Sequence, residues 1–371
     1  MANIFDYLDW RADVPFSADP FNEVDNLVLA QLAYTDFGGI VSEDGAGIPL
    51  RDASKAFFEE HSREEILADT WLTAKAPLLM EKMVEGARFR DTMLSRYVNE
   101  TDPEQGIQLS AVTFTFPDGS AYIAFRGTDA TLVGWKEDFH FAFLSETEGQ
   151  GRAVSYLEDA AKGVRGPLYV GGHSKGGNLA VYAASFCERE VQNRIVTVYS
   201  NDGPGFREEI LERPGYLYIL PKVVSIIPEM SVIGLLLSTK SEHRVIKSSA
   251  FGILQHDALT WSVHRNRFVE APLKVVSKLI DKSLSDWLKQ MDGEARKFFT
   301  ETIFSLFEST GAENFIEIAQ QKWKSTEAIF TAIREMSKET RQEMLSQLQQ
   351  LGQSSSQTAA EYLLSLLNKK K

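Results

Sequence analysis

The stretch that most constrains the fold of this 371-residue chain runs from Leu168 to Ala180. Its first half is an apolar run typical of a buried strand, and its second half is typical of a helix. The two halves meet at Gly172-His-Ser-Lys-Gly176, a G-x-S-x-G match at a strand-to-helix turn. This context predicts a sharp turn that projects the Ser174 hydroxyl from the sheet edge, with glycines where a Cβ would strike neighbouring backbone. The alternative is a glycine-rich turn whose serine has no function.

Strand and helix patterns alternate on both sides of this turn. Two β-rich runs, separated by Pro117-Asp-Gly-Ser120, predict an antiparallel hairpin upstream of it. Downstream, further β-rich runs are separated by segments with helical spacing. This alternation predicts a mostly parallel, doubly wound sheet that occupies residues 1–271. The expected strands are 111–116, 121–125, 168–172, 195–199, 223–227 and 243–247.

The character of the chain changes after about residue 272, because no β-rich run follows. Residues 272–371 are therefore predicted to form an all-helical C-terminal region, with amphipathic helices that pack on the first domain, on a partner protein or on a second copy. Residues 352–357, Gly-Gln-Ser-Ser-Ser-Gln, are predicted to form a linker. The expected helices are 273–291, 296–307, 314–336, 338–351 and 359–367.

Charge and composition exclude several classes of protein. The formal net charge of −13 argues against general nucleic-acid binding, which favours a basic face. No run reaches the roughly 18 apolar residues of a membrane-spanning helix, and the acidic N-terminus does not resemble a secretory signal. Cys187 is the one cysteine, so an internal disulfide framework is excluded. Together these features predict a cytoplasmic protein.

A serine at such a turn becomes a nucleophile only with a base in hydrogen-bond reach and a carboxylate that orients the base. On this kind of fold the chain order is serine, acid, histidine. Three histidines follow Ser174, and His256 is the preferred base because it lies in a loop-like stretch beyond the last predicted strand. His243 begins a predicted strand, with its side chain expected at the surface, and His264 lies in a basic cluster. His173, beside the serine, is expected to form a wall of the site.

Two carboxylates compete for the role of the orienting acid. Asp202 and Glu229 each end a predicted strand, where ligands bind in open α/β sheets. Asp202 is favoured because Gly203-Pro-Gly205 fixes the backbone that follows it, but a turn-capping aspartate would fit the same pattern. Glu229 remains the alternative acid. Asp257 is a poor third candidate, since it adjoins the base and cannot easily reach the far ring nitrogen.

The backbone N–H of Lys175 and the residue Thr128 are predicted to form an oxyanion hole. Thr128 follows Arg126-Gly127 at the end of the hairpin, and its hydroxyl offers a second donor. Arg126 and Asp138 are expected to pair and hold this loop. No Cys/His cluster with metal-ligand spacing occurs, so neither a cofactor nor a metal is expected. Two apolar segments are predicted either to line an acyl pocket or to belong to the core. The apolar segments are 139–144 and 232–237.

With these residues identified, the chain resembles the class 3 (fungal-type) lipases. The resemblance is carried by Ala-Phe-Arg-Gly-Thr128 and by Gly-His-Ser-Lys-Gly-Gly177. It implies an α/β-hydrolase fold, with Ser174 as the nucleophile and Thr128 in the oxyanion hole. Lys175 departs from those lipases, which usually carry leucine there. Their acid follows a later strand, at a place nearer Glu229.

The chain is also similar, over residues 1–265, to a bacterial lipase-like family of unknown function. This second resemblance implies ester hydrolysis without naming a substrate. The segments that carry it are Phe-Arg-Gly-Thr-Asp129, Gly-Trp-Lys-Glu-Asp138, Gly-His-Ser-Lys-Gly-Gly-Asn178, Ser-Asn-Asp-Gly-Pro-Gly205 and Gln-His-Asp257.

The sequence therefore predicts a serine hydrolase that cleaves a small-molecule or lipid carboxylic ester through an acyl-enzyme. Two alternatives stay open. One is a catalytically silent hydrolase-fold scaffold whose helical tail engages a partner. The other is an acyltransferase with the same triad and an acceptor other than water.

Overall fold

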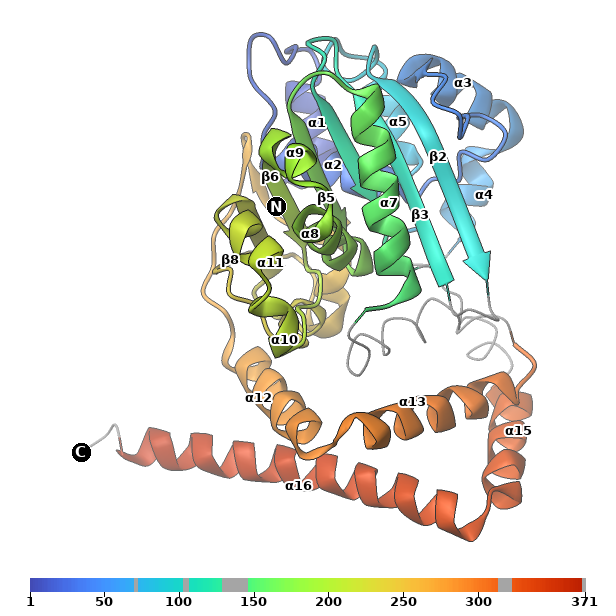
Figure 1. The fold of residues 1–371 in the computed structure, drawn as a ribbon, viewed down its shortest axis with the longest axis vertical. Helices are drawn as coiled ribbons and strands as arrows, with labels where there is room; N and C mark the ends of the chain where they lie inside the picture. Colours follow the sequence, from blue (N-terminus) through green and yellow to red (C-terminus); the bar gives the residue numbers. More distant parts are fainter. Residues whose placement is uncertain (70–72, 103–106, 129–145, 313–321, 369–371) are drawn as a thin grey trace.

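An eight-stranded sheet forms the centre of the protein, in a computed structural model that describes residues 1–69, 73–102, 107–128, 146–312 and 322–368 (Figure 1). The strands lie in the sheet in their sequence order. Strands β1 to β4 pair antiparallel, whereas β4 to β8 run parallel, so the carboxyl ends of β4 to β8 share one edge. The strands are β1 (Ile48–Pro49), β2 (Met93–Asp102), β3 (Ile107–Thr115), β4 (Ala121–Phe125), β5 (Leu168–His173), β6 (Ile195–Asn201), β7 (Val223–Pro228) and β8 (His243–Ile246), with a separate hairpin of β9 (Val263–His264) and β10 (Arg267–Phe268).

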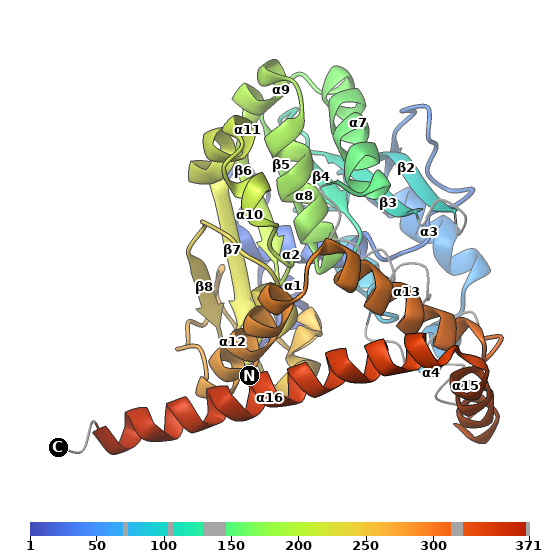
Figure 2. The same ribbon diagram turned by 60° about the horizontal axis from the view of Figure 1, so that its bottom comes forward.

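Helices cover both faces of this sheet (Figures 1 and 2). Side chains alternate between faces along a strand, and every residue of β4 is buried, as expected for a strand covered on both sides. The crossover helices α7, α8 and α11 pack on one face, and α1, α2 and α5 from the N-terminal segment pack on the other. These helices and their short neighbours are α1 (Ile4–Arg11), α2 (Glu23–Leu32), α3 (Leu50–Glu60), α4 (Arg63–Ala68), α5 (Leu78–Met83), α7 (Glu148–Gly163), α8 (Lys175–Phe186), α9 (Arg189–Arg194), α10 (Glu208–Leu211) and α11 (Pro214–Ile219).

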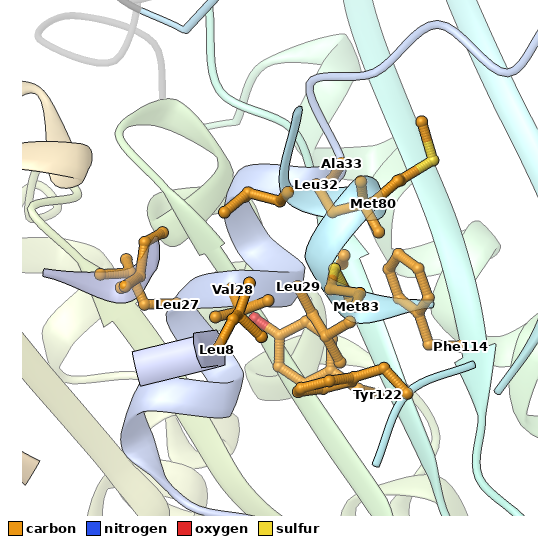
Figure 3. Close-up of a cluster of buried hydrophobic side chains, with 14 of the residues drawn as sticks. Leu8, Leu27, Val28, Leu29, Leu32, Ala33, Met80, Met83, Phe114 and Tyr122 are labelled. Atoms are coloured by element: carbon orange, nitrogen blue, oxygen red, sulfur yellow. The ribbon is translucent and has the colours of Figure 1, made fainter. Parts of the chain in front are cut away.

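Helix α2 is buried almost all round, which explains its apolar sequence. It lies between the sheet and the helices α1 and α5, and Figure 3 shows Leu27, Val28 and Leu29 among side chains from those elements. Phe114 of β3 and Tyr122 of β4 close this cluster from the sheet side (Figure 3). The N-terminal segment therefore covers the second face of the sheet and stabilises the strands whose carboxyl ends carry the candidate site.

The C-terminal region is helical, and the prediction of an α/β-hydrolase fold with a mostly parallel sheet and helical appendage is confirmed. The predicted linker at residues 352–357 is wrong, because these residues lie inside one long helix. Ser355 and Ser356 each donate a hydrogen bond to the carbonyl four residues earlier, so their hydroxyls do not interrupt the helix. Ser354 is buried against α12, where its hydroxyl donates to the Ser283 carbonyl at 3.2 Å. The helices are α12 (Val275–Gln290), α13 (Gly293–Glu308), α15 (Lys322–Glu335) and α16 (Lys338–Asn368).

Within the described ranges, no helix combines the length and the apolar character that crossing a bilayer would require.

Arg88 and Asp25 form a fully buried ion pair beneath the N-terminal helices. The Arg88 Nε donates to Asp25 Oδ1 at 2.8 Å, and the Tyr7 hydroxyl donates to the same oxygen at 2.7 Å. Replacing Arg88 by methionine leaves the Asp25 carboxylate buried without its cation, so we expect the free energy of unfolding to fall by about 3–5 kcal/mol. Urea denaturation measures this loss. The control is Arg90→Met, which removes a half-exposed arginine paired with Asp91 and should change the free energy of unfolding by less than about 0.5 kcal/mol. Equal effects of the two variants would show that the Arg88–Asp25 pair does not stabilise the fold.

Candidate active site

Ser174 sits on a strained turn between β5 and α8. Its φ of 58° and ψ of −132° lie outside the regions that a serine normally adopts. The turn lies very close to β4. A Cβ at Gly172 would be 2.4 Å from the Phe125 carbonyl oxygen of that strand, and a Cβ at Gly176 would be 2.0 Å from it. Only glycine at both positions lets the turn approach the neighbouring strand this closely. The serine side chain is thereby fixed at the carboxyl edge of the sheet.

The end of β4 lies directly against this turn. A Cβ at Gly127 would be 3.0 Å from the Ser174 Cβ, so the segment that leads into Thr128 touches the serine. Thr128 is 8% exposed. The Lys175 backbone begins helix α8, whereas its side chain is buried and its Nζ donates to the Gln108 carbonyl at 2.8 Å and to the Gln108 side chain at 3.0 Å. This lysine–glutamine contact was not predicted, because Gln108 lies 67 residues before Lys175 in the chain. Asp138 and residues 139–144 lie outside the described residues.

Asp202 is fully buried at the end of β6 and is bonded to His256. The distance between its Oδ2 and the His256 Nδ1 is 2.7 Å. Its other oxygen, Oδ1, accepts from the Ser231 hydroxyl at 2.5 Å and from the Gly234 N–H at 3.1 Å. The backbone at Asp202 has a φ of 51°, a conformation that aspartate tolerates better than most residues. These two donors to Oδ1 leave Oδ2 directed at the imidazole.

Glu229, the alternative acid, faces a different partner. Its carboxylate lies 3.0 Å from the Lys274 Nζ at the start of α12. Asp257 accepts the Leu259 N–H through its side chain at 2.9 Å and so caps the short helix that follows. Among the described residues, the carboxylate bonded to the His256 ring is that of Asp202.

The other two candidate histidines have no hydrogen bond to Asp202 within the described residues. The His243 Nδ1 is 2.8 Å from the Ser225 hydroxyl, and the residue is half-buried rather than at the surface as expected. Burial lowers the pKa of His243 below its usual 6.5. His264 is exposed on the β9–β10 hairpin.

The loop that carries His256 is anchored by hydrogen bonds that sequence patterns did not predict. The Trp261 indole N–H donates to the Gln255 carbonyl at 2.7 Å, and the Gln255 side chain accepts the Met230 N–H at 2.8 Å. His173 Nε2 lies 2.8 Å from the His256 carbonyl, and the two rings are 4.6 Å apart at their centroids. The residue before the serine therefore contacts the predicted base.

The protonation state of His173 follows from its partners. A carbonyl only accepts, so Nε2 carries the proton, and Nδ1 accepts from the Tyr34 hydroxyl at 3.0 Å. Within the part of the chain that is described, no hydrogen bond joins the Ser174 hydroxyl to His256. Such bonds are often long in unliganded enzymes and shorten when substrate is present.

His173 should make the protein sensitive to acid. Burial, followed by the nearby His256, lowers the pKa of His173 from 6.5 to about 3. Between these values the unfolded chain binds a proton that the folded chain does not. The free energy of unfolding should therefore fall as the pH decreases from 6.5 towards 3, by up to about 1.4 kcal/mol per pH unit from this residue.

Urea denaturation of His173→Gln at several pH values tests this expectation, since the variant should have a flatter profile over that window than the unmodified protein. His264→Gln, which alters an exposed histidine, should keep the original slope. Parallel profiles for all three proteins would show that His173 is not held neutral by burial.

A cavity of about 280 Å³ opens beside Ser174. The predicted segment 232–237 contributes Val232, Ile233, Leu236 and Leu237 to its wall. Its opposite wall comes from helices α12 and α13, which cross below the carboxyl ends of the parallel strands (Figure 2). The site thus combines a strained serine, a histidine–carboxylate pair and an apolar chamber at one edge of the sheet.

Similarities to solved structures are distant. The Rhizomucor miehei lipase in its native propeptide complex is 17% identical, with a TM-score of 0.32, over 42% of this chain and 57% of that structure. The M37 lipase is 16% identical, with a TM-score of 0.30, over 47% of this chain and 70% of that structure. The chain thus spans less than two thirds of the length of the first of these structures. No curated protein matches it.

The family comparison covers more of the chain. Residues 83–305 match the Mbeg1-like family, and they include β2 to β10, the Ser174 turn, Asp202, His256, α12 and most of α13. This match covers more than half of the chain and carries the lipase-like relationship that the motifs indicated. The chain belongs to the Mbeg1-like family.

Proposed function

We propose that this protein is a serine hydrolase that cleaves a carboxylic ester, with Ser174 as nucleophile, His256 as general base and Asp202 as the orienting acid. The observation that carries the proposal is the 2.7 Å contact between Asp202 and the His256 Nδ1. A carboxylate bonded to Nδ1 fixes the tautomer in which Nε2 accepts a proton. Asp202 stabilises the imidazolium that forms, and the strained turn presents Ser174 at the same sheet edge.

The reaction begins when the Ser174 oxygen attacks the ester carbonyl carbon and its proton passes to the His256 Nε2. Negative charge then develops on the carbonyl oxygen, where the Lys175 N–H at the start of α8 and Thr128 at the end of β4 would stabilise it. Each such donor is typically worth about 3 kcal/mol in the transition state. The imidazolium returns the proton to the departing alcohol, leaving an acyl group on Ser174. Water repeats the sequence, with His256 as its base, and releases the acid.

The substrate in this proposal is a small-molecule or lipid ester with an apolar acyl group. The chamber beside Ser174 is lined mainly by leucine, isoleucine, valine and aromatic side chains. Burial of each methylene group in such a site contributes about 0.8 kcal/mol. The proposed chemistry uses groups of this chain alone.

The proposal also places the enzyme in the cytosol. Cys187 is buried, and burial raises the pKa of its thiol to about 12, so the thiol is an inert core group. A lone, unpaired thiol fits a reducing compartment.

Hydrolysis of p-nitrophenyl esters from acetate through octanoate to palmitate tests the proposal. We expect release of p-nitrophenol with an initial burst, followed by steady turnover, because acylation and deacylation are separate steps. The proposal would be contradicted by a folded protein that cleaves none of the esters and is acylated by none of them. Transfer of the acyl group to an added alcohol, in place of release as acid, would identify an acyltransferase instead.

A further inference from the structure

The wall of the Ser174 cavity that faces away from the sheet is built by the C-terminal helices. Leu284, Trp287 and Leu288 of α12, Met291 after it, and Phe299 of α13 all line this cavity. None of these residues belongs to the segments that carry the serine, the acid or the base. The chamber in which a substrate would meet Ser174 therefore exists only with α12 and α13 in place.

Several contacts hold this wall in one position. The Trp287 ring packs edge-on against Phe299 with centroids 5.2 Å apart, and its indole N–H donates to the Gln347 carbonyl of α16 at 3.0 Å. The Lys274 N–H donates to the Glu229 carbonyl at 2.8 Å, in addition to the ion pair between their side chains, and so ties the start of α12 to the end of β7. Trp287 is 7% exposed.

The extent of the family match supports the same grouping. The Mbeg1-like match continues through α12 and ends at residue 305 within α13. Helices α12 and α13 are thus part of the unit that this family shares.

The Ser174 cavity borders a more polar one. This second cavity, of about 260 Å³, shares five lining residues with the first: Leu236, Leu237, Leu284, Leu288 and Arg296. This second cavity contains charged side chains, including Arg207 and Glu209, but not Ser174. The Arg296 Nε donates to the Leu288 carbonyl at 3.0 Å, and this bond places the guanidinium where the apolar and the charged cavities meet.

We propose, on the basis of the proposed function, that α12 and α13 form the acyl-binding wall and that Leu288 and Arg296 set the length of the acyl chain accepted. The apolar cavity alone, at about 280 Å³, is slightly smaller than the roughly 300 Å³ of the smallest usual ligand sites, which suits a medium-length chain. A longer chain would place its last methylene groups among charged side chains, where their burial contributes little. Octanoyl and dodecanoyl esters should therefore be preferred over stearoyl esters.

Leu288→Trp, made in the full chain, is the most direct test, because Leu288 is half-buried and lines both cavities, so that a larger side chain there reduces the space where they meet. The matched control is Leu348→Trp, which makes the same change at an exposed position of α16. Binding of octanoate and dodecanoate is measured by calorimetry in a Ser174→Ala background, so that the result does not depend on turnover. Circular dichroism checks that each variant retains its helical content.

We expect Leu288→Trp to weaken dodecanoate binding about 15-fold, which corresponds to roughly two methylene groups at about fourfold each, and to change octanoate binding much less. Leu348→Trp should alter neither. Met291→Ala, which enlarges the cavity, should shift the preference towards the longer acid and supports the proposal even if Leu288→Trp folds poorly.

Two results would overturn this inference. One is a dodecanoate affinity unchanged by both Leu288→Trp and Met291→Ala in folded protein. The other is hydrolysis of octanoyl and stearoyl esters with equal kcat/KM. Either result would leave the proposed ester hydrolysis standing, whereas failure of that reaction would show as an absence of turnover with every ester.

Discussion

Replacement of Ser174 by alanine should reduce kcat for ester hydrolysis by about 10⁵- to 10⁶-fold, the loss seen when the nucleophile of a serine hydrolase is removed. Without the hydroxyl no acyl-enzyme forms, and His256 has no group to deprotonate. The turn that holds Ser174 depends on the glycines at 172 and 176, which the substitution leaves in place. We therefore expect the thermal unfolding midpoint to change little. Steady-state rates on the preferred ester measure the effect.

Ser185→Ala is the matched control for this variant. Ser185 lies on α8, the helix that follows Ser174, is also buried, and donates its hydroxyl to the Val181 carbonyl at 2.7 Å. Its loss should leave kcat within about twofold, because surface or core substitutions away from a site act on stability rather than on chemistry. Comparable rates for Ser174→Ala and the unmodified protein would exclude Ser174 as the nucleophile.

Asp202→Asn should lower kcat by about 10⁴-fold while the fold is retained. The carboxylate accepts the His256 Nδ1–H, and an amide of the same shape can present its NH₂ group there, which selects the wrong tautomer. The ring then carries its proton on Nε2 and cannot act as a base towards Ser174. The Ser231 hydroxyl and the Gly234 N–H still have an oxygen to which they can donate, so the loop structure should persist.

Glu229→Gln distinguishes between the two candidate acids. The Glu229 carboxylate pairs with Lys274, and its amide variant should retain kcat within a few-fold. The lost ion pair is partly exposed and so is worth about 1 kcal/mol or less in stability. A large loss of kcat in Glu229→Gln, with Asp202→Asn nearly unaffected, would reverse the assignment of the acid.

The motif at Ser174 could be predicted from sequence because the constraint is local. A serine at that turn needs small neighbours within two residues, and Gly172 and Gly176 are visible in the chain itself. The strands on either side were likewise evident from apolar runs. Strand β2 was not predicted, since its sequence, Met-Leu-Ser-Arg-Tyr-Val-Asn-Glu-Thr-Asp, is polar along an outer part of the sheet where pairing with β3 decides its conformation.

The choice between Asp202 and Glu229 depends on contacts that chain order cannot reveal. Both residues end parallel strands, and either could reach a histidine delivered from downstream. What separates them is that Ser231 and Gly234, after the next strand, fold back onto Asp202. A Cβ at Gly234 would lie 2.4 Å from the Asp202 Oδ1, so this contact also requires glycine there.

The C-terminal region illustrates the same limit. Its helices were predicted from amphipathic spacing, but the Ser-rich segment at 352–357 read as a linker because serine favours turns over helix interiors. Packing against α12 overrides that preference, as the buried Ser354 shows. No spacing in the sequence indicates that Trp287 and Phe299 complete a chamber at Ser174, because that arrangement is set by how three helices meet.

Labelling of the intact protein with a fluorophosphonate, followed by mass spectrometry, tests the central claim most directly. The reagent phosphonylates a serine only when a neighbouring base activates it, and it requires no knowledge of the natural ester. We predict a single adduct on the peptide that contains Ser174, absent in Ser174→Ala and slow to form in Asp202→Asn and His256→Gln. A folded protein that stays unlabelled, or that carries the adduct on another residue at the same rate in Ser174→Ala, would contradict the account.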